Sequence, residues 1–139
     1  MRAVALDLGE RRIGVAVSDA TGRMAFPRPC IARRRERGED HRAIADLVDE
    51  VGADVVVVGL PLSLDGRRGP AATAAAHESV VLARVLEGHG ASVETFDERL
   101  TTVTAEAALG AAGRRARERR GRVDSAAATV LLQAWLDSR

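Results

Sequence analysis

Four consecutive valines, Val55–Val58, constrain the fold of this chain more than any other part of its sequence. A short apolar run of β-branched residues, ended here by Gly59, is typical of a strand buried on both faces of a parallel sheet. Such a strand needs helices on both sides, and helical patterns flank it at about Asp40–Val51 and Pro70–Leu86. The run therefore predicts an α/β fold.

Three further strands are predicted before the valine run. Arg2–Leu8 is largely apolar, and Arg12–Ser18 follows it after a short turn, so the two should form a hairpin. A weaker strand covers Met24–Ala32, where Pro27 and Pro29 confine it to an edge, because proline has no N–H to donate to a neighbouring strand. We therefore expect the sheet to begin as a three-stranded meander.

The remainder of the chain alternates between loops, strands and helices. Leu60–Gly69 is rich in turn residues, Ser92–Phe96 has the pattern of a strand, and Thr101–Ala112 has that of a helix. An arginine-rich loop over Arg114–Arg122 precedes a final helix from about Asp124 to Leu136. The order β-β-β-α-β-α-β-α-α predicts one three-layer domain over residues 1–139, with helices flanking a mixed sheet.

The net charge of +1 hides an uneven distribution of arginine, which supplies all 21 basic residues. Residues 28–42 hold six arginines and three acids, and residues 113–123 hold six arginines and one acid. Two basic segments on an acidic body predict a local site for anions, either polyanionic chains or phosphorylated small molecules. With 46% hydrophobic and 2% aromatic residues, the chain should form a packed core but no broad aromatic platform for stacking bases.

The cysteine, histidine and serine residues offer few alternatives for a metal site or a catalytic nucleophile. Cys30 is the one cysteine, which excludes a disulfide framework and a zinc site. The histidines lack metal-ligand spacing and are expected on solvated helix faces or at helix ends, and Ser63 has no evident His or Asp partner. No secretory signal pattern and no apolar run of ~18 residues is found, so we expect a soluble cytoplasmic protein without membrane contact. The three histidines are His41, His77 and His89.

Carboxylates stand out at the ends of two predicted strands. Asp7 lies between two leucines of the first strand, where a buried carboxylate must be neutralised, paired or bound to a cation, unless it caps a turn. Asp97 and Glu98 follow the last predicted strand, and adjacent residues of an extended chain point to opposite faces. At most one of them can therefore face Asp7, and the alternative for either is a surface ion pair with Arg99.

A third carboxylate, Asp124, opens the last predicted helix. At about 100° per residue, it points roughly 160° from the centre of a polar stripe that recurs every four residues. It therefore shares a side with apolar residues, either as the N-cap of the helix or as a ligand directed into the interior. The polar stripe is Ser125, Thr129, Gln133 and Asp137, and the apolar side is Ala127, Ala128, Leu131 and Trp135.

Carboxylates that converge at the carboxyl ends of central strands would form a site of hard oxygen ligands, which suits Mg²⁺ or Mn²⁺. Such a site supports hydrolysis of phosphodiesters, because metal ions about 3.5–4 Å apart can activate the attacking water and stabilise the leaving oxygen.

Four segments, in order, resemble the conserved blocks of the YqgF/RuvX family. These are ribonuclease H-like proteins described as Holliday-junction resolvases and as nucleases that mature the 5′ end of pre-16S ribosomal RNA. The resemblance extends from Met1 to about Leu136. The segments are DLGERRIGVAVSD at 7–19, VVVGLPLSLDG at 56–66, DERLTT at 97–102 and VDSAAATVLLQAWL at 123–136.

The resemblance implies a five-stranded mixed sheet of order 3-2-1-4-5, with an acidic site on its strands and last helix. It identifies Asp7, Glu98 and Asp124 as the catalytic residues and as the ligands of one or two Mg²⁺ or Mn²⁺ ions, and so selects Glu98 over Asp97. It also implies that glycines give the first hairpin its tight backbone, and that the turn after the valine run lies beside the same sheet end. The turn residues concerned are Gly9, Gly14, Gly59 and Pro61.

Arginines near this acidic site are the candidates for binding phosphate. The family tends to carry lysine-rich or mixed basic residues where this chain has RRARERRGR at 114–122, and arginine can bind phosphate in a bidentate fork. In the DERLTT block, Arg99, Thr101 and Thr102 are expected to orient Glu98 or contact phosphate, unless Thr101 caps a helix and Arg99 lies at the surface. The candidates are Arg114, Arg115, Arg117, Arg119, Arg120, Arg122, Arg67, Arg68 and Arg99, with some of residues 33–37.

The resulting hypothesis is a metal-dependent nuclease that uses water as its nucleophile, with RNA favoured over branched DNA and with pre-ribosomal particles as partners. A non-catalytic nucleic-acid-binding assembly factor is the alternative, in which the arginine loop matters and the acids are structural. A sugar-kinase-like phosphotransferase would need two domains of this kind. A monomer or weak dimer is expected, although a junction resolvase needs paired active sites and therefore a dimer.

Overall fold

The computed structural model describes residues 1–101 and 125–139, and its strands form a five-stranded sheet in the order β3-β2-β1-β4-β5. The first three strands pair antiparallel, whereas β1, β4 and β5 are parallel to one another. The predicted sheet order and mixed character are confirmed, and β3 lies at an edge as its prolines require. The strands are β1 (Ala3–Leu8), β2 (Arg12–Ser18), β3 (Ala25–Ala32), β4 (Val55–Leu60) and β5 (Ser92–Asp97).

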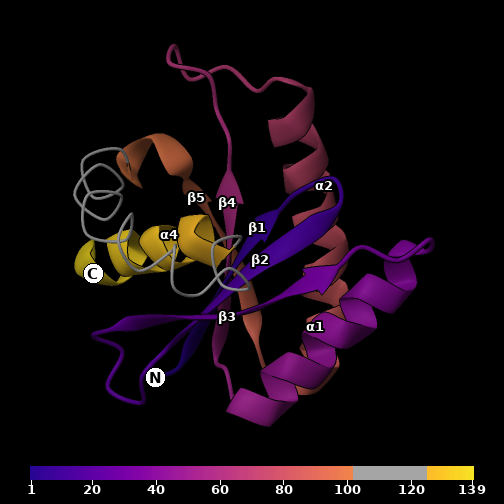
Figure 1. The fold of residues 1–139 in the computed structure, drawn as a ribbon, viewed down its shortest axis with the longest axis vertical. Helices are drawn as coiled ribbons and strands as arrows, with labels where there is room; N and C mark the ends of the chain where they lie inside the picture. The colour runs from indigo at the N-terminus through magenta and orange to yellow at the C-terminus, as the bar shows by residue number, and fades with distance from the viewer. Residues whose placement is uncertain (102–124) are drawn as a thin grey trace.

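Helices cover both faces of this sheet, which gives the three layers that were expected. Figure 1 shows α1 and α2 on one face and α4 on the other. The predicted helix over Thr101–Ala112, beyond its first residue, and the loop Arg114–Arg122 lie outside the described residues. The helices are α1 (Arg37–Val51), α2 (Pro70–Leu86) and α4 (Ala126–Asp137), and two short 3₁₀ helices are η1 (Glu87–His89) and η2 (Glu98–Thr101).

Alternation along the strands divides the core into two parts. In β1, Val4 and Leu6 face α1 and α2, whereas Ala3 and Ala5 face α4. Because side chains in a strand alternate between faces, Asp7 falls on the α4 face with the two alanines. This face has small residues next to the sheet, so that α4 packs closely through Ala128, Leu131, Leu132, Trp135 and Leu136.

The start of α1 differs from the prediction by three residues. The helix begins at Arg37 rather than Asp40, because Asp40 is fully buried inside the first turn, where its Oδ1 accepts the backbone N–H of Arg34 at 2.7 Å. Apolar periodicity could not detect this turn, since its buried side chains are charged. Over the described residues, none of the helices has the length and hydropathy needed to cross a membrane.

Candidate active site

Asp7 lies at the carboxyl end of β1, half-buried on the α4 face of the sheet. The turn after it is tight: the N–H of Gly9 donates to the carbonyl oxygens of Asp7 and Arg12, both at 3.1 Å. A Cβ at position 9 would lie 2.6 Å from the Arg12 carbonyl oxygen, so this turn requires glycine. Gly14 pairs directly with Asp7 and leaves the adjacent position on that face without a side chain. Burial raises the pKa of Asp7 above its usual range.

Glu98 lies on the same face of the sheet, at the end of β5. The strand β5 ends at Asp97, and the chain turns at once into η2, in which the Thr101 hydroxyl donates to the Glu98 carbonyl oxygen at 2.6 Å. The Glu98 side chain lies directly over Gly59 of β4, where a Cβ would come within 2.5 Å of its Oε1. Gly59 therefore provides the space that lets Glu98 lie against the sheet. The helix that Thr101 was expected to cap lies outside the described residues, and here its hydroxyl holds the end of η2.

We call Asp7 and Glu98 the acidic pair. Burial, followed by the charges of Asp7 and Asp97, raises the pKa of Glu98 to about 7. Within residues 1–101 and 125–139, neither side-chain carboxylate of the pair has a hydrogen-bond or ion-pair partner, and no three His, Cys, Asp or Glu side chains form a metal centre. Two half-buried carboxylates with raised pKa values suit a hard divalent cation, which would relieve their repulsion.

Asp97 has a different role from its neighbour. Its carboxylate accepts hydrogen bonds from the Arg99 side chain, with Nε 3.0 Å from Oδ1 and 2.9 Å from Oδ2, and from the Arg99 backbone N–H at 2.9 Å. These hydrogen bonds and the charge of Arg99 hold the pKa of Asp97 below its usual range. The structure therefore places Glu98, and not Asp97, beside Asp7.

The beginning of α4 is fixed to the sheet by Ser125, a residue whose role the sequence did not reveal. Its buried hydroxyl accepts the N–H of Val15 at 3.1 Å and donates to the carbonyl oxygen of Arg28 at 2.6 Å. The pairing of β2 with β3 shifts register between Ile13 and Val15, so the serine bridges the two strands where their own ladder is interrupted. Val15 pairs with Leu6, one residue before Asp7.

The supposed polar stripe of α4 therefore faces β3 rather than solvent at two of its positions. Besides Ser125, Gln133 accepts the N–H of Ala25 and donates to the carbonyl oxygen of Arg23, both at 3.0 Å. Ala127, expected on the apolar side, is exposed. Asp124 lies outside the described residues.

The arginines proposed to bind phosphate fall into two groups. Arg67 and Arg68 are exposed in the loop between β4 and α2, which starts with a tight turn at Pro61, where the N–H of Leu62 donates to Leu60 O at 2.9 Å. Arg99 is partly exposed and joins Asp97 to this loop through a 3.3 Å hydrogen bond to the Leu64 carbonyl oxygen. The six arginines between positions 114 and 122 lie outside the described residues.

A second cluster of charges, which we call the ionic cluster, consists of Arg33, Asp40, His41 and Glu78. Arg33 donates to both oxygens of Glu78 at 2.7 and 3.0 Å and to Asp40 at 3.3 Å. The remaining Arg33 donor, Nε, lies 3.0 Å from the carbonyl oxygen of Gly9, so the cluster also holds the turn after Asp7. Arg33 is therefore buried in internal contacts, whereas Arg34, Arg35 and Arg37 are exposed.

His41 corrects a sequence prediction, since it was expected on a solvated helix face and is buried. Its Nε2 lies 2.9 Å from Glu78 Oε2. The spacing to Ile44, Ala45 and Val48 already places it on the buried stripe of α1, which is the signal that could have identified it. His77 is exposed on α2, and His89 lies at the end of η1 against Asp49, in agreement with expectation.

The sheet order and the position of its acids define a ribonuclease H-like fold. The chain resembles Thermus thermophilus RuvC, solved in complex with a Holliday junction substrate, with a TM-score of 0.64 over 100% of this chain and 95% of that chain. A second structure of the same protein gives 0.63 over 100% and 96%. Both are 15% identical in sequence, so this likeness concerns the fold.

The sequence narrows this class to one family. The family model described as "RuvX: Holliday junction resolvase" matches residues 1–138, and the chain belongs to this family. A relative from Anaeromyxobacter sp. (strain Fw109-5) is 47% identical, with 100% of this chain and 98% of the relative covered. One from Rhodococcus jostii (strain RHA1) is 46% identical, with 99% and 78% covered. Both carry the name "Putative pre-16S rRNA nuclease".

Proposed function

We propose that this protein is a nuclease that hydrolyses phosphodiester bonds with the help of one or two Mg²⁺ or Mn²⁺ ions. One observation carries the proposal: the fold holds Asp7 and Glu98 on one face of the sheet, where burial raises the pKa of both and the charge of Asp7 raises that of Glu98 further. Gly59 leaves the space that the Glu98 side chain occupies, and Gly9 allows the tight turn that follows Asp7. Membership of the RuvX family supports the same activity.

Asp7, Glu98 and Asp124 would hold the cation. Asp124 directly precedes Ser125 in the chain. The Ser125 hydroxyl accepts the N–H of Val15 in β2, and Val15 pairs with Leu6, the residue before Asp7. When bound, a divalent cation supplies Lewis acidity: it activates water for attack and stabilises negative charge on the phosphate. Asp7 and Glu98 would hold that cation at the carboxyl ends of β1 and β5.

The nucleic acid would be held by arginine side chains around the acidic pair. Arg67 and Arg68 are exposed in the loop that Arg99 joins to Asp97. Six further arginines precede Asp124 in the chain: Arg114, Arg115, Arg117, Arg119, Arg120 and Arg122. Arginine suits this task because its planar guanidinium matches phosphate geometry and remains charged.

The substrate that we favour is the precursor of 16S ribosomal RNA, cut at its 5′ end by this single domain in the cytoplasm. The names of the relatives support this choice, whereas the description of the family favours a four-way DNA junction. A monomer or weak dimer suffices for cutting one RNA strand.

Incubation with three substrates would test the proposal: single-stranded RNA, the precursor 16S rRNA end and a four-way DNA junction. We expect cleavage of the rRNA precursor in Mg²⁺ or Mn²⁺ and no cleavage in EDTA. Binding without cleavage in either metal ion would instead support a non-catalytic assembly factor, for which the salt dependence of binding would still report the arginine contacts. Preferred cleavage of the junction would reassign the substrate and predict a dimer.

A further inference from the structure

The loop between β4 and α2 presents a large apolar side chain to solvent. Leu64, at the tip of this loop, is 96% exposed, more than any other large hydrophobic residue in the described part of the chain. Leu100 of η2, two residues after Glu98, is exposed as well. A leucine in this position adds nothing to the core.

Hydrogen bonds within the loop fix the turn that carries Leu64. The N–H of Ser63 donates to the carbonyl oxygen of Arg67 at 3.0 Å, and the N–H of Gly66 donates to that of Ser63 at 2.8 Å. Asp65 accepts the N–H of Arg67 at 3.1 Å. Gly66 has a φ of +85°, which closes the turn in a conformation that favours glycine. The loop is therefore a turn held by its own hydrogen bonds, and this turn directs Leu64 towards solvent.

This turn is attached to the acidic site through Arg99. The guanidinium of Arg99 binds the carboxylate of Asp97, the neighbour of Glu98, and its Nη1 donates to the carbonyl oxygen of Leu64 at 3.3 Å. The same guanidinium lies 3.4 Å from the position of a Cβ on Gly66. One arginine therefore sets the position of the loop tip relative to Glu98.

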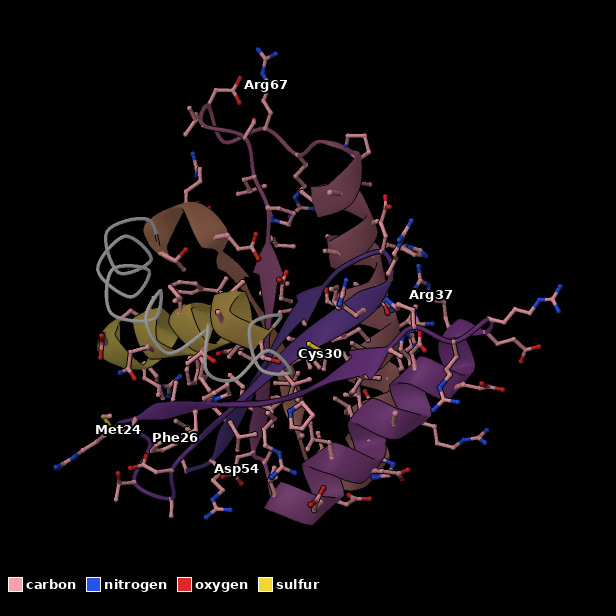
Figure 2. All side chains as sticks on the ribbon, viewed as in Figure 1. Met24, Phe26, Cys30, Arg37, Asp54 and Arg67 are labelled. Carbon is pink, nitrogen blue, oxygen red and sulfur yellow. The ribbon has the colours of Figure 1, made fainter. Side chains whose placement is uncertain are left out.

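Two arginines and one acid follow Leu64 in the loop, and Arg67 Nε lies 3.3 Å from Asp65 Oδ2. The side chain of Arg67 is 87% exposed, and Arg68 is exposed beside it. Figure 2 shows Arg67 at the end of the loop that extends beyond β4, directed away from the body of the protein. An apolar side chain flanked by exposed arginines matches the chemistry of nucleic acid, in which apolar base faces alternate with anionic phosphates.

We propose that Leu64 inserts into the base stack of a bound nucleic acid and holds one nucleobase unstacked beside the phosphate presented to the acidic pair. Arg67 and Arg68 then contact the flanking phosphates, and Arg99 positions the loop. Aliphatic side chains such as leucine are known to open base steps in this way. The inference rests on the proposed nuclease function, since it assumes that nucleic acid reaches the acidic pair.

Fluorescence of 2-aminopurine, which rises when this base leaves the stack, provides the test. The protein with Asp7→Asn, in Mg²⁺, is mixed with short RNA duplexes that carry one 2-aminopurine at each position in turn, and with matching DNA duplexes. We expect fluorescence to rise at one or two adjacent positions. In the same background Leu64→Ala should abolish most of this rise while weakening binding by less than about tenfold, because arginine contacts to phosphate dominate affinity.

Two matched variants separate insertion from general damage. Leu64→Met keeps a long apolar side chain and should retain most of the rise. Val80→Ala removes an exposed apolar group from α2 instead of from the loop, and should change nothing. Leu64→Ala should unfold at the same temperature as the parent, since its side chain makes no packing contribution.

An undiminished rise in Leu64→Ala, an equal loss in Val80→Ala, or the absence of any rise in the parent would each overturn the inference. Cleavage by the wild-type chain is measured in parallel. Unstacking that depends on Leu64 without cleavage in Mg²⁺ or Mn²⁺ would refute the nuclease function alone, whereas cleavage without such unstacking would refute the insertion alone.

Discussion

Two groups of buried carboxylates in this fold differ in how their charge is balanced. In the ionic cluster, burial works against ionisation of Glu78, yet hydrogen bonds from Arg33 and His41 hold its pKa below the usual range. In the acidic pair, burial raises the pKa of Glu98, and the charges of Asp7 and Asp97 raise it further, to about 7. Burial is common to both, so the presence of a cationic neighbour decides the direction of the shift.

This difference separates a structural role from a functional one. The ionic cluster contains its own cation and connects β3, α1, α2 and the turn at Gly9. The acidic pair has no such neighbour in the described part of the chain, and like charges that remain buried together reduce stability. In the function that we propose, a divalent cation would complete this pair. The two groups are also in contact through the backbone, because Gly9 accepts from Arg33 and donates to Asp7.

The largest effect is expected for Asp7→Asn. Loss of one carboxylate should reduce metal-dependent cleavage by at least about 10⁴-fold, about 5.5 kcal/mol of transition-state stabilisation, because the cation would lose a ligand. The free energy of unfolding in EDTA should stay equal or rise, since one charge of a repelling pair is removed. Cleavage rates and urea unfolding measure the two quantities. Asp46→Asn, on the exposed surface of α1, is the control, and full activity of Asp7→Asn would refute the assignment.

Arg33→Met, unlike Asp7→Asn, should lower the free energy of unfolding. Removing the guanidinium leaves Glu78 with His41, and Asp40 with Arg37 and the N–H of Arg34, as partners. Loss of the central cation should lower the free energy of unfolding by up to about 3–5 kcal/mol. The matched control is Arg28→Met, which removes an exposed ion pair with Glu50 and should cost less than about 1 kcal/mol. Urea unfolding of both variants tests the difference. Equal destabilisation would show that the ionic cluster contributes no more than a surface pair.

The sequence predicted the layout of the fold because its apolar patterns are unambiguous. The valine run specified a buried parallel strand, and Pro27 and Pro29 specified an edge strand. The starts of α1 and α4 were less accessible to prediction, because polar side chains in tertiary contacts determine them. Ser125 bonds to Val15, 110 residues away, and no local pattern reports a hydrogen bond of that kind.

The candidate site was predictable only in part from the residues themselves. The choice between Asp97 and Glu98 could not follow from strand alternation, since the chain leaves the strand at Glu98 and turns into η2. It followed from the family resemblance. His41 was expected on a solvated helix face or helix end, and Arg33 lies in the range expected to supply phosphate-binding arginines. The burial of both depends on Glu78, which comes from α2.

A smaller effect is expected for Gly59→Ala. The added Cβ would lie 2.5 Å from Glu98 Oε1, so the carboxylate must leave its present position beside Asp7. We expect cleavage to fall about tenfold or more and the free energy of unfolding to fall by about 1–3 kcal/mol, the usual cost of overpacking. Gly69→Ala is the control, since nothing lies within 4 Å of its Cβ position. Wild-type cleavage by Gly59→Ala would show that the contact between Gly59 and Glu98 does not position the carboxylate.

The smallest expected effect is on the pH dependence of stability, which should have opposite signs for the acidic pair and the ionic cluster. Glu98 has an unfolded pKa near 4.5 and a folded pKa of about 7, so the folded state binds more protons between these values. Stability in EDTA should therefore be highest below pH 4.5 from this group and fall as the pH rises towards 7, by about 1–2 kcal/mol once solvent screening of a half-exposed side chain is included. For Glu78, whose folded pKa is lowered, the contribution is present above pH 4.5 and is lost as the pH falls.

Two isosteric variants separate these contributions in urea unfolding across the pH range. Glu98→Gln should remove the decline between about pH 4.5 and 7, whereas Glu78→Gln should lower stability at neutral pH and flatten the loss under acidic conditions. Saturating Mg²⁺ should also suppress the decline in the wild-type chain, because a cation that binds only the folded state keeps both carboxylates ionised. A decline that persists in Glu98→Gln would mean that Asp7, and not Glu98, carries the proton, and the pair would then act with Asp7 as its more basic member.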